Sequence, residues 1–256
     1  MHPILFSLGK YRLPTYTFFL VLGAFVFLYL GRQEARRLGL PREWFRNLCF
    51  SFLIALYLGS YLMYLIFHFH YYLVNPLKIF DLFKGGLVFH GGLLAGLAVT
   101  YFYANRRNLP WQACIDALAV GLPLGQAVVR IGCFLGGCCY GRPTDLPWAV
   151  IFTSPYTIGP RNIAIHPSQL YEAIVLTGIF AVVYSLRRRK SFEGQLMVIY
   201  LFLSASLRFG VEFYRSPEIR GPAFWQMPLA QLLALAIALA SGFLWWWYGC
   251  RQKVAE

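Results

Sequence analysis

The sequence predicts an all-α polytopic membrane protein, a single integral membrane domain over residues 1–256 with about seven transmembrane helices. Hydrophobic residues make up 59% of the chain and charged residues only 13%, which is too apolar for a water-soluble domain of this length. The apolar residues also form continuous runs near the ~20 residues that a helix needs to cross a bilayer. Strands of a transmembrane barrel would instead alternate polar and apolar residues, so helices are favoured.

Charged or Pro/Gly-rich gaps bound each apolar run and so define the expected crossings in chain order. We expect the crossings at residues 16–31, 47–73, 86–104, 112–131, 169–186, 194–211 and 229–248. The gaps that separate them are, in order, residues 31–46, residues 74–85, the segment NRRN, residues 132–168, the segment LRRRKS and residues 215–228, and the segment CRQK follows the last crossing. The first 14 residues lack an early basic region and a small-residue cleavage site, so we expect the first crossing to be retained.

The positive charges are concentrated in alternate gaps. The segments 31–46, NRRN, LRRRKS and CRQK hold more than half of the 23 lysines and arginines, although the gaps on the opposite side are about twice as long in total. Because cytoplasmic loops are enriched in lysine and arginine, we expect the N-terminus outside and the C-terminus in the cytoplasm. The same clustering indicates that the net charge of +13 sets the topology and does not serve nucleic-acid binding.

Two arginines, Arg130 and Arg208, lie near the outer ends of apolar runs instead of in the gaps. An arginine in hydrocarbon costs about 2.5 to 3.5 kcal/mol, so it needs a partner or water. Snorkelling to the headgroups, or for Arg208 an ion pair with Glu212 one turn later, would meet this need without a function. Two guanidiniums at one depth on different helices also suggest a shared anion, because the planar fork binds two phosphate oxygens at once. The natural anion at that depth is a phospholipid headgroup.

His90 lies in the segment FHGGLLAG, near the start of the third crossing and at the depth of the two arginines. A histidine among apolar residues is either a hydrogen-bonded packing residue or a base that titrates near neutral pH. The neighbouring Gly91 and Gly92 allow the close approach of a lipid or of another helix. Both interpretations place this segment in the middle of the bundle.

The segment HPSQLYE opens the fifth crossing, with Pro167 suited to its first turn. Gln169 and Glu172 are three residues apart and therefore share one helical face. Together with His166 they form a polar cluster at the outer membrane edge. Capping and anchoring explain Glu172 less well than they explain Pro167.

These segments resemble the motifs of one known family. FHGGLLAG at 89–96, RIGCFLGGCCYGRPT at 130–144, HPSQLYE at 166–172 and LRFGVEFYR at 207–215 are similar, in order and spacing, to those of prolipoprotein diacylglyceryl transferases. That family transfers the diacylglyceryl group of phosphatidylglycerol to the lipobox cysteine of a prolipoprotein signal peptide, which forms a thioether and releases glycerol phosphate. The resemblance implies this activity at the outer leaflet of the bacterial inner (plasma) membrane, without a cofactor.

The resemblance also implies roles for individual residues. It makes His90, Arg130 and Arg208 the catalytic residues, with the arginines stabilising the leaving phosphate and His90 accepting the thiol proton. We expect substrate contacts at Tyr16, Gly91, Gly92, Arg142, His166, Gln169, Glu172 and Glu212. The chain departs from the family motif after Arg130, where Cys133, Gly136 and Cys138 replace two asparagines and a glutamate.

Three cysteines, Cys133, Cys138 and Cys139, lie just outside the fourth crossing, on the side that we expect to be oxidising. A disulfide from Cys133 to Cys138 or Cys139 is one expectation, because a glycine-rich loop can close so short a ring. A zinc or iron-sulfur site normally takes four ligands, and the remaining cysteines are expected on or near the opposite side, so we expect no metal. One of the three could instead be a nucleophile activated by Arg130.

Two other functions stay open from the sequence. A membrane thiol oxidoreductase would use the loop of Cys133, Cys138 and Cys139 and would exchange disulfides with a quinone or a partner protein. A phospholipid-binding or transport protein would hold a headgroup between the arginines and form no product.

Overall fold

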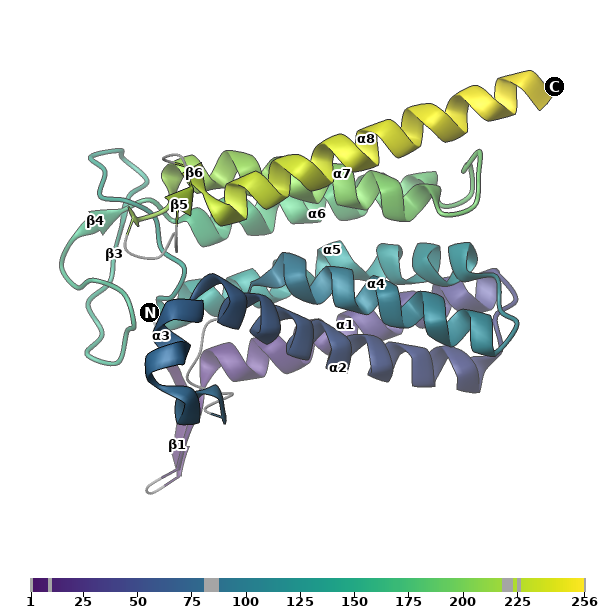
Figure 1. Cartoon of the computed structure of the whole chain (residues 1–256). Coiled ribbons are helices and arrows are strands. Elements are labelled where there is room, and N and C mark those ends of the chain that lie inside the picture. Colours follow the sequence, from purple (N-terminus) through teal and green to yellow (C-terminus); the bar gives the residue numbers. More distant parts are fainter. Residues whose placement is uncertain (1, 9–10, 81–87, 218–222, 225–226, 256) are drawn as a thin grey trace.

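The computed structural model describes residues 2–8, 11–80, 88–217, 223–224 and 227–255. Long helices run side by side, and short strands gather near one end of them (Figure 1). The chain is therefore an all-α polytopic membrane protein, as the sequence predicts. In chain order the elements are β1 (Ile4–Leu8), β2 (Tyr11–Pro14), α1 (Thr15–Arg37), α2 (Arg42–Phe67), α3 (Phe69–Val74), η1 (Pro76–Phe80), α4 (Phe89–Arg106), α5 (Trp111–Gly136), β3 (Val150–Ile151), β4 (Ala164–Ile165), α6 (Ser168–Leu186), α7 (Gln195–Val211), η2 (Glu212–Tyr214), β5 (Ala223–Phe224), β6 (Met227–Pro228) and α8 (Leu229–Ala255).

Each expected crossing corresponds to a long helix, in the order α1, α2, α4, α5, α6, α7 and α8. Within the described ranges, six helices are long and apolar enough to span a membrane, and α4 is not among them. α4 has 18 residues and includes the polar His90, Asn105 and Arg106. The third expected crossing also begins at residue 86, which lies outside the described residues. The number of seven crossings therefore stays a prediction.

The region around the second crossing differs from the prediction. α2 ends at Phe67, and His68, with a backbone φ of −112°, separates it from α3. α3 turns away from the direction of the bundle (Figure 1). The antiparallel hairpin of β1 and β2, in which Ser7 pairs with Arg12, was also not predicted from the sequence. The hairpin lacks the long apolar run that marks a crossing, whereas the apolar run of the second crossing continues past His68 into α3.

The two ends of the bundle carry different segments (Figure 1). The C-terminus lies at one end, together with the connections from α1 to α2, from α4 to α5 and from α6 to α7, which contain the basic segments. The N-terminus and residues 137–167 lie at the opposite end. This asymmetry is the kind that the positive-inside rule describes, and the orientation in the membrane stays a prediction.

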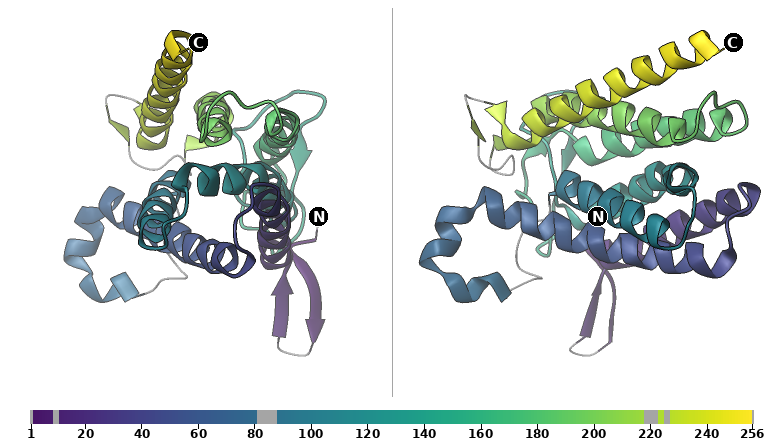
Figure 2. Two further views of the ribbon diagram at one scale, coloured as in Figure 1. Left: turned by 90° about the vertical axis from the view of Figure 1, so that its right-hand side faces the viewer. Right: turned by 45° about the vertical axis from the view of Figure 1, so that its right-hand side comes forward.

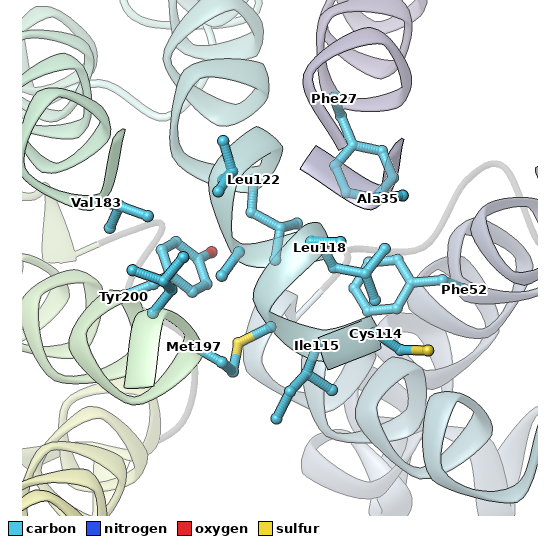
Figure 3. Close-up of a cluster of buried hydrophobic side chains, with 14 of the residues drawn as sticks. Phe27, Ala35, Phe52, Cys114, Ile115, Leu118, Leu122, Val183, Met197 and Tyr200 are labelled. Atoms are coloured by element: carbon cyan, nitrogen blue, oxygen red, sulfur yellow. The ribbon is translucent and has the colours of Figure 1, made fainter. Parts of the chain in front are cut away.

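α5 is the central helix of the bundle. The most apolar window of α5 is 56% buried, against 17% for the corresponding windows of α2 and α8. Figure 3 shows Leu118 and Leu122 of α5 between Phe27 of α1 and Tyr200 of α7. Figure 2 shows α8 at the outer edge of the bundle, where it packs on α7. Side chains on α5 are therefore positioned by helices on both of its sides.

Asp116, near the start of α5, fixes the N-terminus of α7. Its fully buried carboxylate accepts hydrogen bonds from the backbone N–H groups of Gly194 and Leu196, each at 3.0 Å, and from that of Met197 at 3.3 Å. Lys190 adds an ion pair at 3.0 Å. Capping of this kind satisfies N–H groups that have no partner within the helix. It holds α7 against α5 at the end opposite the arginines described next.

Candidate active site

Arg130 and Arg208, which the sequence places on different helices, meet at Glu172. Arg130 Nη2 lies 2.7 Å from Glu172 Oε2, and Arg208 Nη1 lies 3.8 Å from Glu172 Oε1. The side chains come from the C-terminal part of α5, the last turn of α7 and the N-terminal part of α6. All three helices bring these parts to the end of the bundle that carries residues 137–167 (Figure 1).

A second carboxylate extends this arrangement into an arginine network. Arg208 Nη2 lies 2.7 Å from Glu212 Oε2, and Arg215 Nη1 lies 4.0 Å from the same oxygen. Three guanidiniums and two carboxylates leave the network with one net positive charge. Arg215 was not among the predicted site residues, although its spacing of three from Glu212 is a sequence signal for such a pair.

The network is accessible from outside the protein. The side chains of Arg130 and Arg208 are 21% and 16% exposed, whereas that of Glu172 is 5% exposed. Among the described residues, Glu172 Oε1 accepts no hydrogen bond, and Arg208 reaches it only at 3.8 Å. A guanidinium has five N–H donors, so both arginines keep donors for another anion.

His90 lies at the N-terminal turn of α4, is buried, and interacts electrostatically with Arg208. The neighbouring Gly91 and Gly92 face α2. A Cβ atom added at Gly92 would lie 2.1 Å from the carbonyl oxygen of Leu56, and one added at Gly91 would lie 2.8 Å from that of Gly59. Close packing of α4 on α2 thus accounts for both glycines, and their contact with substrate stays a prediction.

Two side chains of the segment HPSQLYE hold the loop that carries Cys138 and Cys139 in place. The side-chain amide of Gln169 donates a hydrogen bond to the carbonyl of Cys138 at 2.7 Å, and the Ser168 hydroxyl donates one to the carbonyl of Cys139 at 2.9 Å. Ser168 and Gln169 are both fully buried. Ser168 was not among the predicted site residues, because its partner lies 29 residues earlier in the chain. Gln169 thus has a structural contact, and its contact with substrate stays a prediction.

His166 and Arg142 belong to the segment that covers the same end of the bundle. The His166 N–H donates to the carbonyl of Arg142 at 3.0 Å, and the Arg142 N–H donates to that of Tyr214 at 2.9 Å. Burial, with the positive charge of Arg142, lowers the pKa of His166 below its usual 6.5. The Nδ1 atom of His166 lies 3.2 Å from the hydroxyl of Tyr171. These contacts tie the segment to η2, next to the arginine network.

The three cysteines form a compact thiol cluster. The sulfur atoms of Cys133, Cys138 and Cys139 all lie within 4.8 Å of one another, and all three residues are free thiols in the structure. Hydrogen bonds from the thiols of Cys133 and Cys138, followed by the positive charges of Arg130 and Arg215, lower the pKa of Cys139. The structure thus brings the three residues together, and the disulfide between two of them stays a prediction.

Tyr16 lies in the first turn of α1, against the end of α5. A Cβ atom added at Gly136 would lie 3.7 Å from the Cβ of Tyr16, and one added at Gly132 would lie 3.5 Å from its Cα. Tyr16 also interacts electrostatically with the thiol cluster and with Arg130. The structure therefore brings this predicted site residue next to the arginine network.

A sequence family described as prolipoprotein diacylglyceryl transferase matches residues 3–247. The chain belongs to this family. The phosphatidylglycerol–prolipoprotein diacylglyceryl transferase of Geobacter sulfurreducens is 33% identical, over 93% of this chain and 91% of the relative. The enzyme of Chromohalobacter salexigens is 34% identical over 99% and 94%, and that of Bordetella parapertussis is 33% identical over 95% and 94%.

Membership of the prolipoprotein diacylglyceryl transferase family confirms the resemblance seen in the four motifs and makes the chain a transferase. Three of these motifs meet in the arginine network, through Arg130, Glu172 and Arg208. The fourth supplies His90, which is buried within electrostatic range of Arg208. The roles of these residues in the transferase reaction stay predictions, which the geometry supports.

Proposed function

We propose that this chain transfers the diacylglyceryl group of phosphatidylglycerol to the lipobox cysteine in the signal peptide of a prolipoprotein. The reaction forms a thioether and releases glycerol phosphate. Prolipoprotein diacylglyceryl transfer is the first step of lipoprotein maturation, and family membership assigns the chain to that step. The names of the three relatives include phosphatidylglycerol and prolipoprotein, which supports these two substrates.

The observation that carries the proposal is the convergence of Arg130 and Arg208 on Glu172. The arginine network has one net positive charge, and a phosphodiester has one negative charge. A phosphodiester between the guanidiniums of Arg130 and Arg208 would therefore be neutralised. It would accept hydrogen bonds from guanidinium donors that the glutamates leave unused. This charge balance favours a lipid with a single phosphodiester charge.

In the proposed reaction the cysteine sulfur attacks the glycerol carbon that bears the phosphate. The carbon–sulfur bond forms, the carbon–oxygen bond breaks, and the phosphate leaves with a second negative charge. Fixed guanidiniums stabilise this added charge more than the single charge of the bound lipid, which lowers the barrier. Loss of one such contact costs about 3 to 4 kcal/mol of barrier.

His90 is the proposed acceptor of the thiol proton. Its imidazole is buried within electrostatic range of Arg208, and when neutral it adds no charge to the network. An oxygen of the headgroup is the competing acceptor. A His90→Gln variant separates the two: loss of one limb of the pH profile of kcat/KM supports proton transfer to His90, and an unchanged profile assigns the proton to the headgroup.

We place the reaction at the outer leaflet of the bacterial plasma membrane. The arginine network lies at the end of the bundle opposite the basic connections (Figure 1). Basic connections are typically cytoplasmic, so the network would face the outer side, together with the N-terminus.

The test uses the purified protein in lipid, with phosphatidylglycerol and a lipobox peptide, followed by measurement of the peptide mass. A gain equal to one diacylglyceryl group supports the proposal. An Arg130→Ala variant should form little product, and the exposed Arg161, replaced by alanine, is the matched control. Saturable lipid binding without a product would overturn the proposal in favour of a lipid-binding protein. Cysteine-dependent disulfide exchange in its place would favour a thiol oxidoreductase.

A further inference from the structure

We propose that Cys133, Cys138 and Cys139 form a binding site for one soft metal ion, and that Cu(I) is the ion that fits it best. Within the described part of the chain, these residues are the one group of three or more metal-ligating side chains whose ligand atoms lie together. Their sulfur atoms lie within 4.8 Å of one another. Three sulfurs at about 2.3 Å from a central ion would lie about 4 Å apart, so binding requires only small movements.

The backbone around the thiol cluster is already fixed. Gly137 ends α5 in the left-handed conformation, with φ of +74°, and the N–H of Cys138 donates to the carbonyl of Cys133 at 3.1 Å. Ser168 and Gln169, both on α6, donate hydrogen bonds to the backbone carbonyls of Cys139 and Cys138. A loop that is ordered before binding loses little conformational entropy when the ligand arrives.

Positive charge close to the cluster favours bound thiolates. Arg130 lies one turn before Cys133, and both Arg130 and Arg215 act electrostatically on Cys139. Each thiol loses its proton to solvent as its sulfur–metal bond forms. Cu(I) with three thiolates therefore carries two net negative charges, which the one net positive charge of the arginine network offsets in part.

The donor set selects the ion. Thiolates are soft ligands, which favour Cu(I), zinc and iron-sulfur clusters over calcium or magnesium. Zinc and iron-sulfur sites take four ligands, whereas Cu(I) is satisfied by three sulfurs in a plane. The expectation of no metal from the sequence rested on the missing fourth ligand, and a three-coordinate ion removes that objection. Cu(I) keeps its oxidation state on binding, so no oxidant or reductant is needed.

The site is reachable from outside. Cys138 and Cys139 are partly exposed, whereas Cys133 is buried behind them at the end of α5. The other cysteines provide internal controls, because Cys49 and Cys114 are buried in the core and Cys250 is exposed on α8. The inference does not depend on the transferase activity, since metal binding has its own readout.

The test titrates the full-length, fully reduced protein in detergent with Cu(I), under anaerobic conditions and in competition with a coloured Cu(I) chelator. We expect one Cu(I) per chain, and at least a 100-fold weaker affinity in each of the Cys133→Ser, Cys138→Ser and Cys139→Ser variants. The Cys250→Ser variant should match the wild type. X-ray absorption of the wild-type complex should show three sulfur ligands, a result that does not depend on how the variants fold.

Three results would overturn the inference. The first is a wild type that binds Cu(I) no more tightly than the Cys138→Ser variant. The second is a Cys250→Ser variant whose affinity falls as much as that of the Cys138→Ser variant. The third is an absorption spectrum that shows fewer than three sulfur ligands. Because each result concerns the metal alone, it leaves the test of peptide lipidation unaffected.

Discussion

Glu172 bridges Arg130 and Arg208, with Oε2 at 2.7 Å from the first guanidinium and Oε1 at 3.8 Å from the second. With Arg215 and Glu212 the network holds three guanidiniums and two carboxylates, so it keeps one positive charge for an anionic lipid. Glu172 also sets the distance between the guanidiniums of Arg130 and Arg208 before any ligand binds. Glu172 is therefore expected to position the arginines for catalysis.

Replacing Glu172 with glutamine tests this positioning role. Glutamine keeps the shape but removes the charge, so the arginines should bind the lipid phosphate more strongly while they lose their fixed orientation. We expect kcat to fall about 10- to 100-fold with an unchanged or lower KM for phosphatidylglycerol. Separate measurement of kcat and KM checks this, with the exposed Glu43→Gln as control. An unchanged kcat would remove the role.

Replacing Arg130 with lysine tests the guanidinium fork. Lysine retains the positive charge but cannot bind a carboxylate and a phosphate with a planar pair of donors. We expect kcat/KM to fall about 100-fold, which corresponds to about 3 kcal/mol. The Arg161→Lys variant, at an exposed position, should keep the wild-type value. Wild-type kinetics in Arg130→Lys would show that charge alone suffices.

Replacing Gly92 with alanine tests the placement of His90. The added Cβ would lie 2.1 Å from the carbonyl oxygen of Leu56 and 2.2 Å from the Ser60 hydroxyl, so α4 has to move away from α2. We expect a lower thermal unfolding midpoint and a loss of transferase activity. Gly178→Ala in α6 meets nothing within 4 Å and should unfold and react like the wild type. Equal behaviour of the two variants would contradict the packing described for α4.

Replacing Asp116 with alanine tests the anchoring of α7. The change leaves three backbone N–H groups and Lys190 without their buried acceptor. Buried donors without a partner and a broken ion pair together cost about 3 kcal/mol or more. Thermal unfolding in detergent should show this loss, whereas Asp145→Ala, at an exposed position, should not. A midpoint equal to the wild type would show that α7 does not depend on this cap.

The lowered pKa of His166 predicts a pH dependence of stability. Burial and Arg142 hold the folded pKa below the usual 6.5, so the folded state binds fewer protons than the unfolded chain. The stabilisation is therefore present above about pH 6.5 and is lost as the pH falls towards the folded pKa. The difference in unfolding midpoint between the wild type and His166→Gln should shrink from pH 7 to about pH 5. A constant difference would exclude this linkage.

The sequence predicted the helices well, because a long apolar run bounded by charges has few other structures in a membrane. It also predicted that Arg130 and Arg208 lie at one depth on different helices, and the phospholipid anion that they would share stays a prediction. It did not predict that Glu172 would bridge them, because which side chains meet across α5, α6 and α7 depends on helix rotation. Ser168 was missed for a similar reason, since its partner is a backbone carbonyl at Cys139. Such contacts leave no periodic signal in the sequence.

The hairpin of β1 and β2 and the break at His68 were also not predicted. The strands of the hairpin have five and four residues, too short for a clear alternation of polar and apolar residues. The apolar run continues past His68 into α3, so hydropathy alone extends the second crossing beyond its structural end. Elements that depend on a few hydrogen bonds are thus harder to predict from the sequence than helices that are buried in lipid.

The most direct test of the account is a double-mutant cycle on kcat/KM for phosphatidylglycerol with Arg130→Gln, Arg208→Gln and the double variant. If both guanidiniums hold one phosphodiester, the first replacement already destroys the shared site, and the double variant should be hardly slower than the slower single variant. If the two losses multiply, the arginines act independently, and the claim that they bind one phosphate together is contradicted.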